Sequence, residues 1–265
     1  MIILLNPYGQ RSNILFQHIH LDSFCRENGI VFYNRFIQSM NLDYPNVGNK
    51  NQFIEYASAL KVPQILNRLQ LAKYVNFDDE SRNEEYKKAL LKSKLVICHG
   101  WVFRSFETVG KYRTVYKHIF KPNVDELRLF ESFLKKEDPK TKILGVHVRR
   151  GDYKEFLNGK FFYTDAHYID KIRQMIRLLG ESCRVIIFSN DSHLDHKLYK
   201  ADFEDVIFSK ESTIADHFLM SKCDYLLGPP STFTMWASYM GEVPLYHIEQ
   251  ADAALDLDSF KIQYG

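Results

Sequence analysis

An apolar run in the middle of the chain ends in several charged or titratable side chains, in the segment 147–152 with the sequence His-Val-Arg-Arg-Gly-Asp. Residues 143–148 have the aliphatic and β-branched pattern of a buried parallel strand, and Gly151 allows the chain to turn out of it. In open α/β sheets, ligands bind beyond the carboxyl ends of the strands. A guanidinium group fits phosphate oxygens with two parallel hydrogen bonds. The spacing therefore predicts that Arg149 and Arg150 together bind a diphosphate.

Two alternative interpretations of this segment involve no nucleotide. Arg150-Gly151-Asp152 is also an integrin-type tripeptide, although such tripeptides arise by chance and this one follows a buried strand. An ion pair between arginine and aspartate at a domain edge is the structural alternative, because charge clusters often serve only the fold.

A second set of polar side chains follows a later apolar strand, residues 225–227. Here a Gly-Pro-Pro turn leads into a helix, and Ser231 and Thr232 lie at its start, where hydroxyl and N–H groups bind phosphate or simply cap the helix. Asp216 lies on a helix predicted over residues 213–222. A carboxylate accepts two N–H donors at once, and guanine offers such a pair on its N1 and N2 edge, so Asp216 is a candidate for base recognition.

The amino-terminal loop, residues 9–13, is polar and leads into the start of a helix, where anions or sugar hydroxyls are readily bound. The functional interpretation places Arg11 and Asn13 in the wall of a nucleotide-sugar cleft. The alternative is an ordinary turn.

The segment from His147 to Tyr153 resembles the His-x-Arg-Arg-x-Asp signature of the α-1,2-fucosyltransferase family and of its α-1,6- and protein O-fucosyltransferase relatives. Residues 216–233 resemble the family's later helix, strand and Ser/Thr segment, and residues 9–18 resemble its amino-terminal loop. The resemblance implies a GT-B-like fold, GDP-fucose as donor substrate, a glycan acceptor, inversion at the anomeric carbon, and no metal or other cofactor.

By this resemblance Asp216 matches the family's guanine-reading aspartate. His147 is a further candidate for guanosine, and the two arginines with the hydroxyls at residues 231 and 232 are candidates for the diphosphate. Asp152 and Glu155, the carboxylates nearest the arginines in the sequence, are both candidates for the general base. Alternatively, Asp152 only orients an arginine. Transfer of another sugar, hydrolysis of a nucleotide, or a non-catalytic sugar-nucleotide or glycan-binding module are the competing functions.

Strands and helices alternate along the chain, which predicts an α/β protein with parallel sheets. We expect two Rossmann-like domains with a cleft between them, residues 1–138 on the acceptor side and residues 139–265 binding the nucleotide sugar. The polar, proline-containing stretch 137–142 is the predicted linker. The polar carboxyl-terminal tail is expected to cross back to the first domain.

The composition limits the classes of partner. With 35 Lys and Arg against 33 Asp and Glu, the formal net charge is +2, so the chain lacks the strongly basic character of a nucleic-acid-binding domain. Basic and aromatic residues interleave over residues 102–121, which we interpret as an amphipathic helical face. The four cysteines show no Cys-x-x-Cys pair and are expected to be reduced thiols of a cytoplasmic protein. No apolar run is long enough to span a bilayer, which leaves at most peripheral membrane contact.

Overall fold

The computed structural model describes residues 1–48, 65, 68–69, 71–123, 131–136, 138–180 and 182–265. By its internal contacts the chain divides into two compact units, Met1–Asn123 together with Tyr264, and Val124–Gln263 together with Gly265. Unit 2 therefore begins before residue 139, where we place the start of the second domain from the sequence. The limit between residues 138 and 139 stays a prediction.

Unit 1 contains a parallel sheet with the strand order β2-β1-β4-β3. Its strands are β1 (Ile2–Leu4), β2 (Phe32–Asn34), β3 (Lys73–Phe77) and β4 (Val96–Gly100). Its described helices are α1 (Arg11–Glu27), α2 (Arg35–Gln38), α5 (Asn83–Lys92), α6 (Phe106–Lys111) and α7 (Arg113–Ile119), with 3-10 turns η1 (Pro45–Val47) and η2 (Glu80–Arg82). The chain thus begins with a strand, a helix and a second parallel strand, β1, α1 and β2.

Unit 2 contains a second parallel sheet with the order β7-β6-β5-β8-β9. Its strands are β5 (Lys142–Val148), β6 (Cys183–Ser189), β7 (Val206–Phe208), β8 (Tyr225–Gly228) and β9 (Leu245–His247). Its described helices are α9 (Glu131–Leu134), α10 (Asp165–Leu179), α11 (His196–Asp202), α12 (Thr213–Met220) and α13 (Thr232–Gly241), with 3-10 turns η4 (Asp152–Lys154), η5 (Phe156–Gly159) and η6 (Leu257–Ser259). The apolar run predicted as a buried parallel strand, residues 143–148, is therefore part of the central strand of this sheet.

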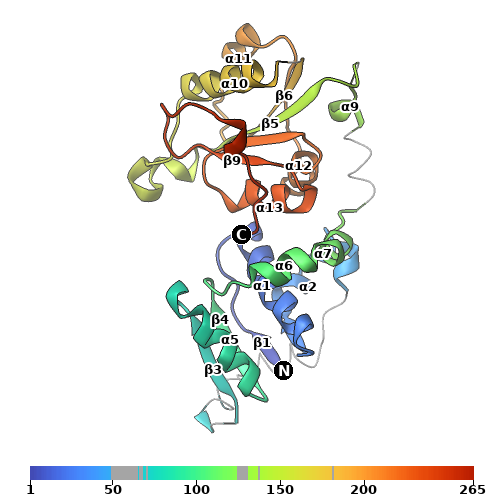
Figure 1. The fold of residues 1–265 in the computed structure, drawn as a ribbon, viewed down its shortest axis with the longest axis vertical. Helices are drawn as coiled ribbons and strands as arrows, with labels where there is room; N and C mark the ends of the chain where they lie inside the picture. Colours follow the sequence, from blue (N-terminus) through green and yellow to red (C-terminus); the bar gives the residue numbers. More distant parts are fainter. Residues whose placement is uncertain (49–64, 66–67, 70, 124–130, 137, 181) are drawn as a thin grey trace. The chain divides into compact units, whose positions relative to one another are not determined.

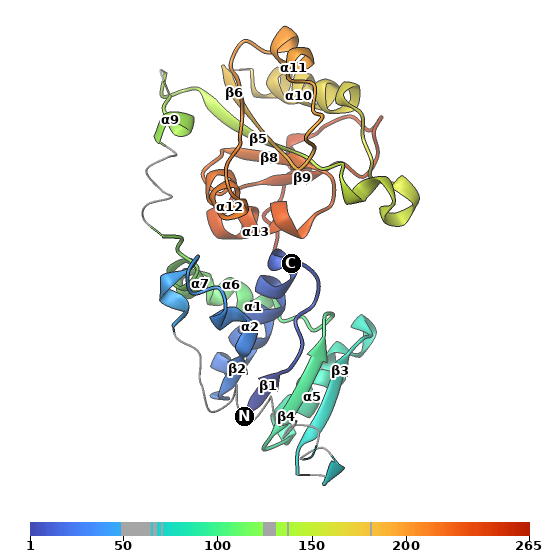
Figure 2. The same ribbon diagram turned by 180° about the vertical axis from the view of Figure 1, so that it is seen from behind.

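Helices cover both faces of the unit 2 sheet, with α10 and α11 on one side and α12 and α13 on the other (Figures 1 and 2). Side chains alternate across a strand, so Leu144 and Val146 of β5 pack into the core on the α10 side. Ile143 packs into the core on the α12 side. His147 lies on the same side of β5 as Ile143, and this places its ring next to α12 and α13.

Tyr264, the last residue but one of the sequence, packs with unit 1. A terminal nitrogen of Arg113 donates to its phenol oxygen at 2.6 Å, and the guanidinium lies 5.1 Å from the ring centre. His20 Nε2 lies 3.0 Å from its carbonyl oxygen. The expectation that the tail crosses back to the first part of the chain is confirmed.

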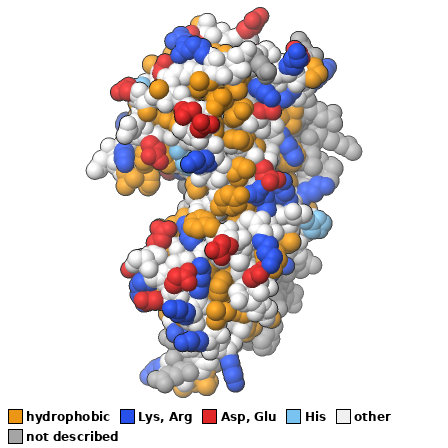
Figure 3. Space-filling model, viewed as in Figure 1, with side chains coloured by type: hydrophobic (Ala, Val, Ile, Leu, Met, Phe, Trp, Pro, Cys, Tyr) orange, Lys and Arg blue, Asp and Glu red, His pale blue; other side chains and the backbone are white. Residues whose placement is uncertain are grey.

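The surface of the molecule carries both signs of charge. Lys, Arg, Asp and Glu side chains are interspersed over the face in Figure 3, without an extended basic area among the described residues of that view. Among the described residues, no helix combines the length and the apolar character that crossing a membrane requires.

Gly145 lies in the middle of β5 because its neighbours leave no room for a side chain. A Cβ at this position would come within 2.7 Å of a Leu226 methyl carbon and 2.9 Å of the Cys223 sulfur. The close approach keeps β5 near the segment between α12 and β8, which helps to position the end of the strand.

We expect Gly145→Ala to lower the free energy of unfolding by about 1–3 kcal/mol, because overpacking a dense core forces its neighbours apart. Gly110→Ala in α6 is the matched control, since the nearest atom to its added Cβ is 3.6 Å away and alanine favours a helix. Urea-induced unfolding of both variants measures the difference. Equal stability of Gly145→Ala and the unmodified chain would contradict this packing argument.

Candidate functional site

The candidate site lies where the central strands of unit 2 end. In a parallel sheet the carboxyl ends of all strands meet at one edge, so the residues that follow β5, β6 and β8 lie close together there. Val148 ends β5 beside Ser189 of β6, and the Ser189 hydroxyl donates to the Val148 carbonyl oxygen at 2.7 Å. The residue that follows, Arg149, begins the segment with the charged side chains.

Arg149 connects the loop after β5 to the start of α13. Its Nε and a terminal nitrogen donate to the two Asp152 carboxylate oxygens at 3.2 and 2.7 Å. Its other terminal nitrogen donates to Ser231 Oγ at 3.0 Å, and its guanidinium lies 4.6 Å from the centre of the Tyr153 ring. The side chain retains 16% exposure. A guanidinium fixed at three points at the edge of the sheet can bind an anion without first being ordered.

Arg150 turns to a different set of partners. Its terminal nitrogens lie 2.5 Å from Asp165 and 3.3 Å from Asp191, and its Nε donates to the Tyr163 carbonyl oxygen at 3.0 Å. Tyr199 donates its hydroxyl to Asp165 at 2.9 Å. The hydrogen bonds and negative charge of Asp165 raise the pKa of Arg150 against the opposing effect of burial.

The two adjacent arginines therefore have different surroundings. Arg149 reaches α13 and Arg150 reaches the start of α10, so in this structure they do not face a common point. The Arg150 backbone N–H is also bonded, to Asn190 Oδ1 at 3.2 Å. Joint binding of a diphosphate by both arginines stays a prediction, and Arg150 additionally has the ion-pair role that the sequence left open.

Ser231 caps α13, as one of the two interpretations of the sequence has it. Its Oγ accepts from the Phe233 backbone N–H at 3.2 Å while it also accepts from Arg149. The Tyr153 phenol donates to the Pro230 carbonyl oxygen and thereby holds the turn before the helix. Thr232 is the first residue of this ten-residue helix. The amino terminus of α13 carries the partial positive charge that favours a phosphate, and the Arg149 guanidinium lies beside it.

His147 is a buried, neutral ring under this site. It is 6% exposed, and burial, together with the nearby Arg149 charge, lowers its pKa to about 3. Its ring centre lies 5.0 Å from that of Phe233, which in turn lies 4.1 Å from His217 of α12. Among the described residues, His147 Nδ1 is buried without a hydrogen-bond partner. The ring can therefore take one hydrogen bond but does not act as a charged acid near neutral pH.

Asp216 lies on the first turn of α12, one residue before the histidine that packs on Phe233. Its carboxylate accepts from Ser209 Oγ, and burial raises its pKa to about 6. Ser212 caps this helix by accepting from the Ala215 N–H at 3.2 Å. A carboxylate held at a partly desolvated position gains most from a ligand that donates to it, as a guanine edge does.

The two candidate bases differ in their environment. Hydrogen bonds from Arg149 lower the pKa of Asp152, which makes this carboxylate a weaker proton acceptor. Glu155 lies in the exposed segment between η4 and η5. Asp152 thus contacts Arg149 and Glu155 is exposed, and the choice of the general base between them stays a prediction.

Arg11 and Asn13 belong to unit 1, and their role in nucleotide-sugar binding stays a prediction. Arg11 begins α1 and forms an ion pair with Asp43. Asn13 packs against Gly9, which has a φ of +64° and whose added Cβ would collide with the Asn13 amide. The loop is therefore an ordered turn, as the alternative to the functional interpretation states.

Asp165 is the residue that sequence reasoning missed. It reads as an ordinary first residue of α10 after the capping Thr164, and its ion pair with Arg150 follows only from the fold. Asp191, just after β6, accepts from the His193 N–H at 2.8 Å and also pairs with Arg150. No local sequence signal distinguishes such a double role.

The structure offers little for a metal ion. Asp256 and Asp258 form an Asp-x-Asp triplet, but Asp256 accepts from the Asp258 N–H at 3.1 Å and so caps η6. No group of three or more His, Cys, Asp or Glu side chains suited to a metal occurs within the part of the chain that the structure describes.

Two parallel α/β units in one chain define the GT-B-like class of fold, and solved fucosyltransferases share it. A variant of FUT1 from Arabidopsis thaliana in complex with GDP is 12% identical, with a TM-score of 0.60 over 98% of this chain and 73% of that one. The fucosyltransferase NodZ from Bradyrhizobium is 13% identical, with a TM-score of 0.56 over 93% of this chain and 95% of that one.

The model of glycosyl transferase family 11 matches residues 112–252, more than half of the sequence, and the chain belongs to this family. A galactoside 2-alpha-L-fucosyltransferase of Caenorhabditis elegans is 26% identical over 160 residues, which cover 57% of this chain and 44% of that protein. The chain thus spans less than half of that relative's length.

Proposed function

We propose that this chain is an inverting, metal-independent transferase that moves fucose from GDP-fucose to a glycan hydroxyl, with an α-1,2 linkage to galactose. Membership of glycosyl transferase family 11 and the named activity of the galactoside fucosyltransferase relative support the donor and the linkage. The observation that carries the proposal is the position of Arg149, fixed by Asp152 and Ser231 beside the amino terminus of α13. This is a site for the charge of a departing diphosphate.

In the proposed reaction, the bond between fucose and GDP breaks as the acceptor hydroxyl attacks the anomeric carbon from the opposite face. Negative charge then accumulates on the GDP oxygens, where Arg149 and the N–H groups at the start of α13 stabilise it. The attacking hydroxyl loses its proton to a carboxylate, for which the accessible Glu155 is our candidate. Asp152 orients the arginine, and Arg150 positions the loop through Asp165 and Asp191.

In the proposed complex, Asp216 accepts the N1 and N2 hydrogens of guanine, and His147 supplies one further hydrogen bond to the guanosine. His147 of β5 and His217 of α12 both pack on Phe233, and Asp216 is the residue before His217. These contacts support the arrangement, because they bring α12 and His147 to the same side of the sheet edge. GDP should therefore raise the melting temperature more than UDP or ADP does, since neither uracil nor adenine presents two adjacent N–H donors in this geometry.

Transfer from GDP-fucose to a panel of galactosides, with and without excess EDTA, tests the reaction. We expect transfer to galactose that the chelator leaves unchanged. Binding of GDP without transfer would instead indicate a non-catalytic binding module. Transfer that EDTA abolishes would contradict metal independence, and preference for UDP would indicate a different donor.

The pKa of Asp216 predicts how GDP binding depends on pH. Burial raises this pKa from 3.8 to about 6, and guanine binding requires the ionised carboxylate, so affinity for GDP should rise about tenfold between about pH 5 and about pH 7. Because the folded pKa of about 6 exceeds the unfolded value of 3.8, the stability of the ligand-free chain should fall as the pH rises from about 4 to about 6. Calorimetric titration with GDP measures the affinity, and urea-induced unfolding measures the stability, of the unmodified chain and of Asp216→Asn. A pH dependence of GDP affinity as steep in Asp216→Asn as in the unmodified chain would contradict the assignment, since the terminal phosphate of GDP titrates equally in both.

We also propose a cytoplasmic location. All four cysteines are free thiols, which supports a reducing compartment.

A further inference from the structure

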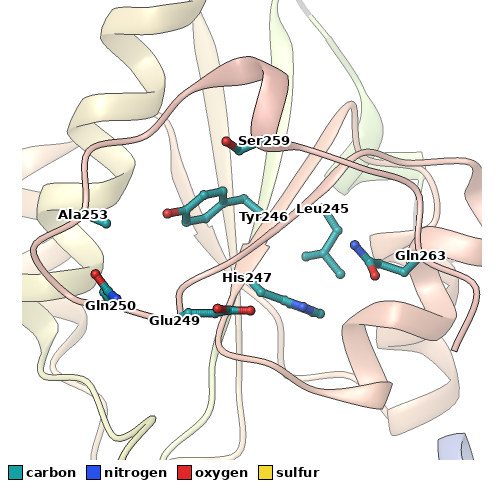
Figure 4. Close-up of a pocket in the computed structure, with 8 residues that line it drawn as sticks. All are labelled: Leu245, Tyr246, His247, Glu249, Gln250, Ala253, Ser259 and Gln263. Atoms are coloured by element: carbon teal, nitrogen blue, oxygen red, sulfur yellow. The ribbon is translucent and has the colours of Figure 1, made fainter. Parts of the chain in front are cut away.

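A polar pocket lies along the outer edge of β9. It shares no lining residue with the site around Arg149 and Arg150, here called the arginine site. The chain leaves β9, turns through η6 and returns antiparallel to the strand, where Leu245 and Lys261 exchange backbone hydrogen bonds of 3.0 and 3.1 Å. The loop between these points and β9 border an open hollow of about 420 Å³ (Figure 4). This volume is within the range of small-molecule sites.

Tyr163 and two side chains of α10 hold the pocket loop in place. Lys171 is fully buried and donates its ammonium group to the Ala253 carbonyl oxygen. The Leu255 N–H donates to Gln174 Oε1 at 2.9 Å. The Tyr163 phenol donates to the Ile248 carbonyl oxygen at 2.8 Å, just beyond the end of β9. Because the loop is anchored at three points, the pocket exists without a ligand.

Several polar groups that line the pocket are left for a ligand. Within the described residues, the side chains of Glu249, Gln250 and Ser259 line it without an intramolecular hydrogen bond. Backbone groups alternate in direction along a parallel strand, so the N–H and C=O of His247 point to the same outer edge as those of Leu245. The pocket thus offers carboxylate and amide oxygens, amide hydrogens and a hydroxyl.

The charge of this region selects the class of ligand. Glu249 is the one carboxylate among the residues that line the pocket, and no Lys or Arg lines it, so an anionic ligand is disfavoured. Planar carboxylate and carboxamide groups suit the adjacent hydroxyls of a sugar, which donate and accept hydrogen bonds at once. Tyr246, which also lines the pocket, adds an aromatic surface for the C–H groups of such a ring.

We propose that this pocket binds a neutral saccharide unit, with Glu249 as its principal hydrogen-bond acceptor. The site goes beyond the proposed transfer reaction, because none of its lining residues belongs to the arginine site. It gives unit 2 a second point of attachment to a hydroxyl-rich polymer or oligosaccharide.

Saturation-transfer NMR and calorimetry with glucose, mannose, xylose and maltose test the proposal, and galactosides are left out because the proposed transfer site also binds them. We expect saturable binding of at least one of these sugars with a dissociation constant on the order of 1–10 mM, and at least fivefold weaker binding to Glu249→Ala. Glucuronic acid should bind more weakly than glucose because of its charge. Asp258→Ala is the matched control, since it removes an exposed carboxylate of the same loop that does not line the pocket.

Two further measurements separate this site from the proposed donor site. Glu249→Ala should bind GDP as the unmodified chain does, and Arg149→Ala should retain sugar binding. No saturable binding by any of the four sugars would overturn the pocket proposal. So would equal affinity in Glu249→Ala, or loss of sugar binding in Arg149→Ala, and none of these outcomes would bear on GDP-dependent transfer.

Discussion

Arg149→Ala should reduce the turnover number for transfer from GDP-fucose by about 10²–10³-fold, the largest effect on activity that we expect from one substitution in this chain. The size follows from the removal of one fixed group that stabilises developing negative charge in a transition state. The guanidinium is held by Asp152 and Ser231 before any ligand binds, so little reorganisation opposes its action. Initial-rate measurements at saturating GDP-fucose give the comparison.

Arg149→Lys refines this test. A lysine retains the positive charge but loses the planar fork that reaches both Asp152 and Ser231, so its activity should lie between those of the unmodified chain and Arg149→Ala. Arg173→Ala is the matched control, because Arg173 is a half-exposed arginine of the same unit that pairs with Asp202. Turnover of Arg149→Ala within a factor of two of the control would remove the basis of the proposed mechanism.

Arg150→Met should have its main effect on stability, with a loss of about 2–4 kcal/mol in the free energy of unfolding. Asp165 and Asp191 are 18% and 17% exposed, and without the arginine their two charges would remain close together and uncompensated. Urea-induced unfolding measures the loss. Arg149→Met should cost less than about 1 kcal/mol by the same measurement, because its partner Asp152 is 51% exposed and readily solvated.

The double variant Asp165→Asn with Asp191→Asn provides the decisive comparison for Arg150. If the arginine serves to balance these charges, removing it from the double variant should cost much less than removing it from the unmodified chain. Unchanged stability of Arg150→Met together with lost GDP binding would instead show that Arg150 contacts the nucleotide, as the sequence predicts for both arginines.

Much of unit 2 was predictable because its signals are local. The apolar run before Arg149 has the pattern of a strand buried on both faces, and the structure confirms it as the central strand β5. Thr164 and Gly180 are residue types that begin and end helices, and α10 begins after the first and ends before the second, whose φ is +61°. Caps and glycine conformations depend on a few adjacent residues, so a sequence expresses them directly.

Membership of a compact unit is not a local property of the sequence. Proline and charged residues at 137–142 have the composition of a linker, and the limit between residues 138 and 139 stays a prediction, while the contacts divide the chain into units after Asn123. Composition reports the solvation of a segment, whereas membership of a unit depends on which distant residues it contacts. Tyr264 is the clearest example, because it is counted with unit 1 although it follows the last strand of unit 2.

The sequence by itself determined that a segment with two adjacent arginines follows a buried strand, because residue type and hydrophobic pattern are local properties. Only the tertiary structure decided that Arg149 and Arg150 have different partners. Asp165 lies at the start of helix α10 and Asp191 follows strand β6, and both pair with Arg150. Ser231 lies at the start of helix α13 and bonds to Arg149. The direction of a side chain at a sheet edge is set by charges that the fold brings from elsewhere in the chain, and no spacing within the motif encodes them.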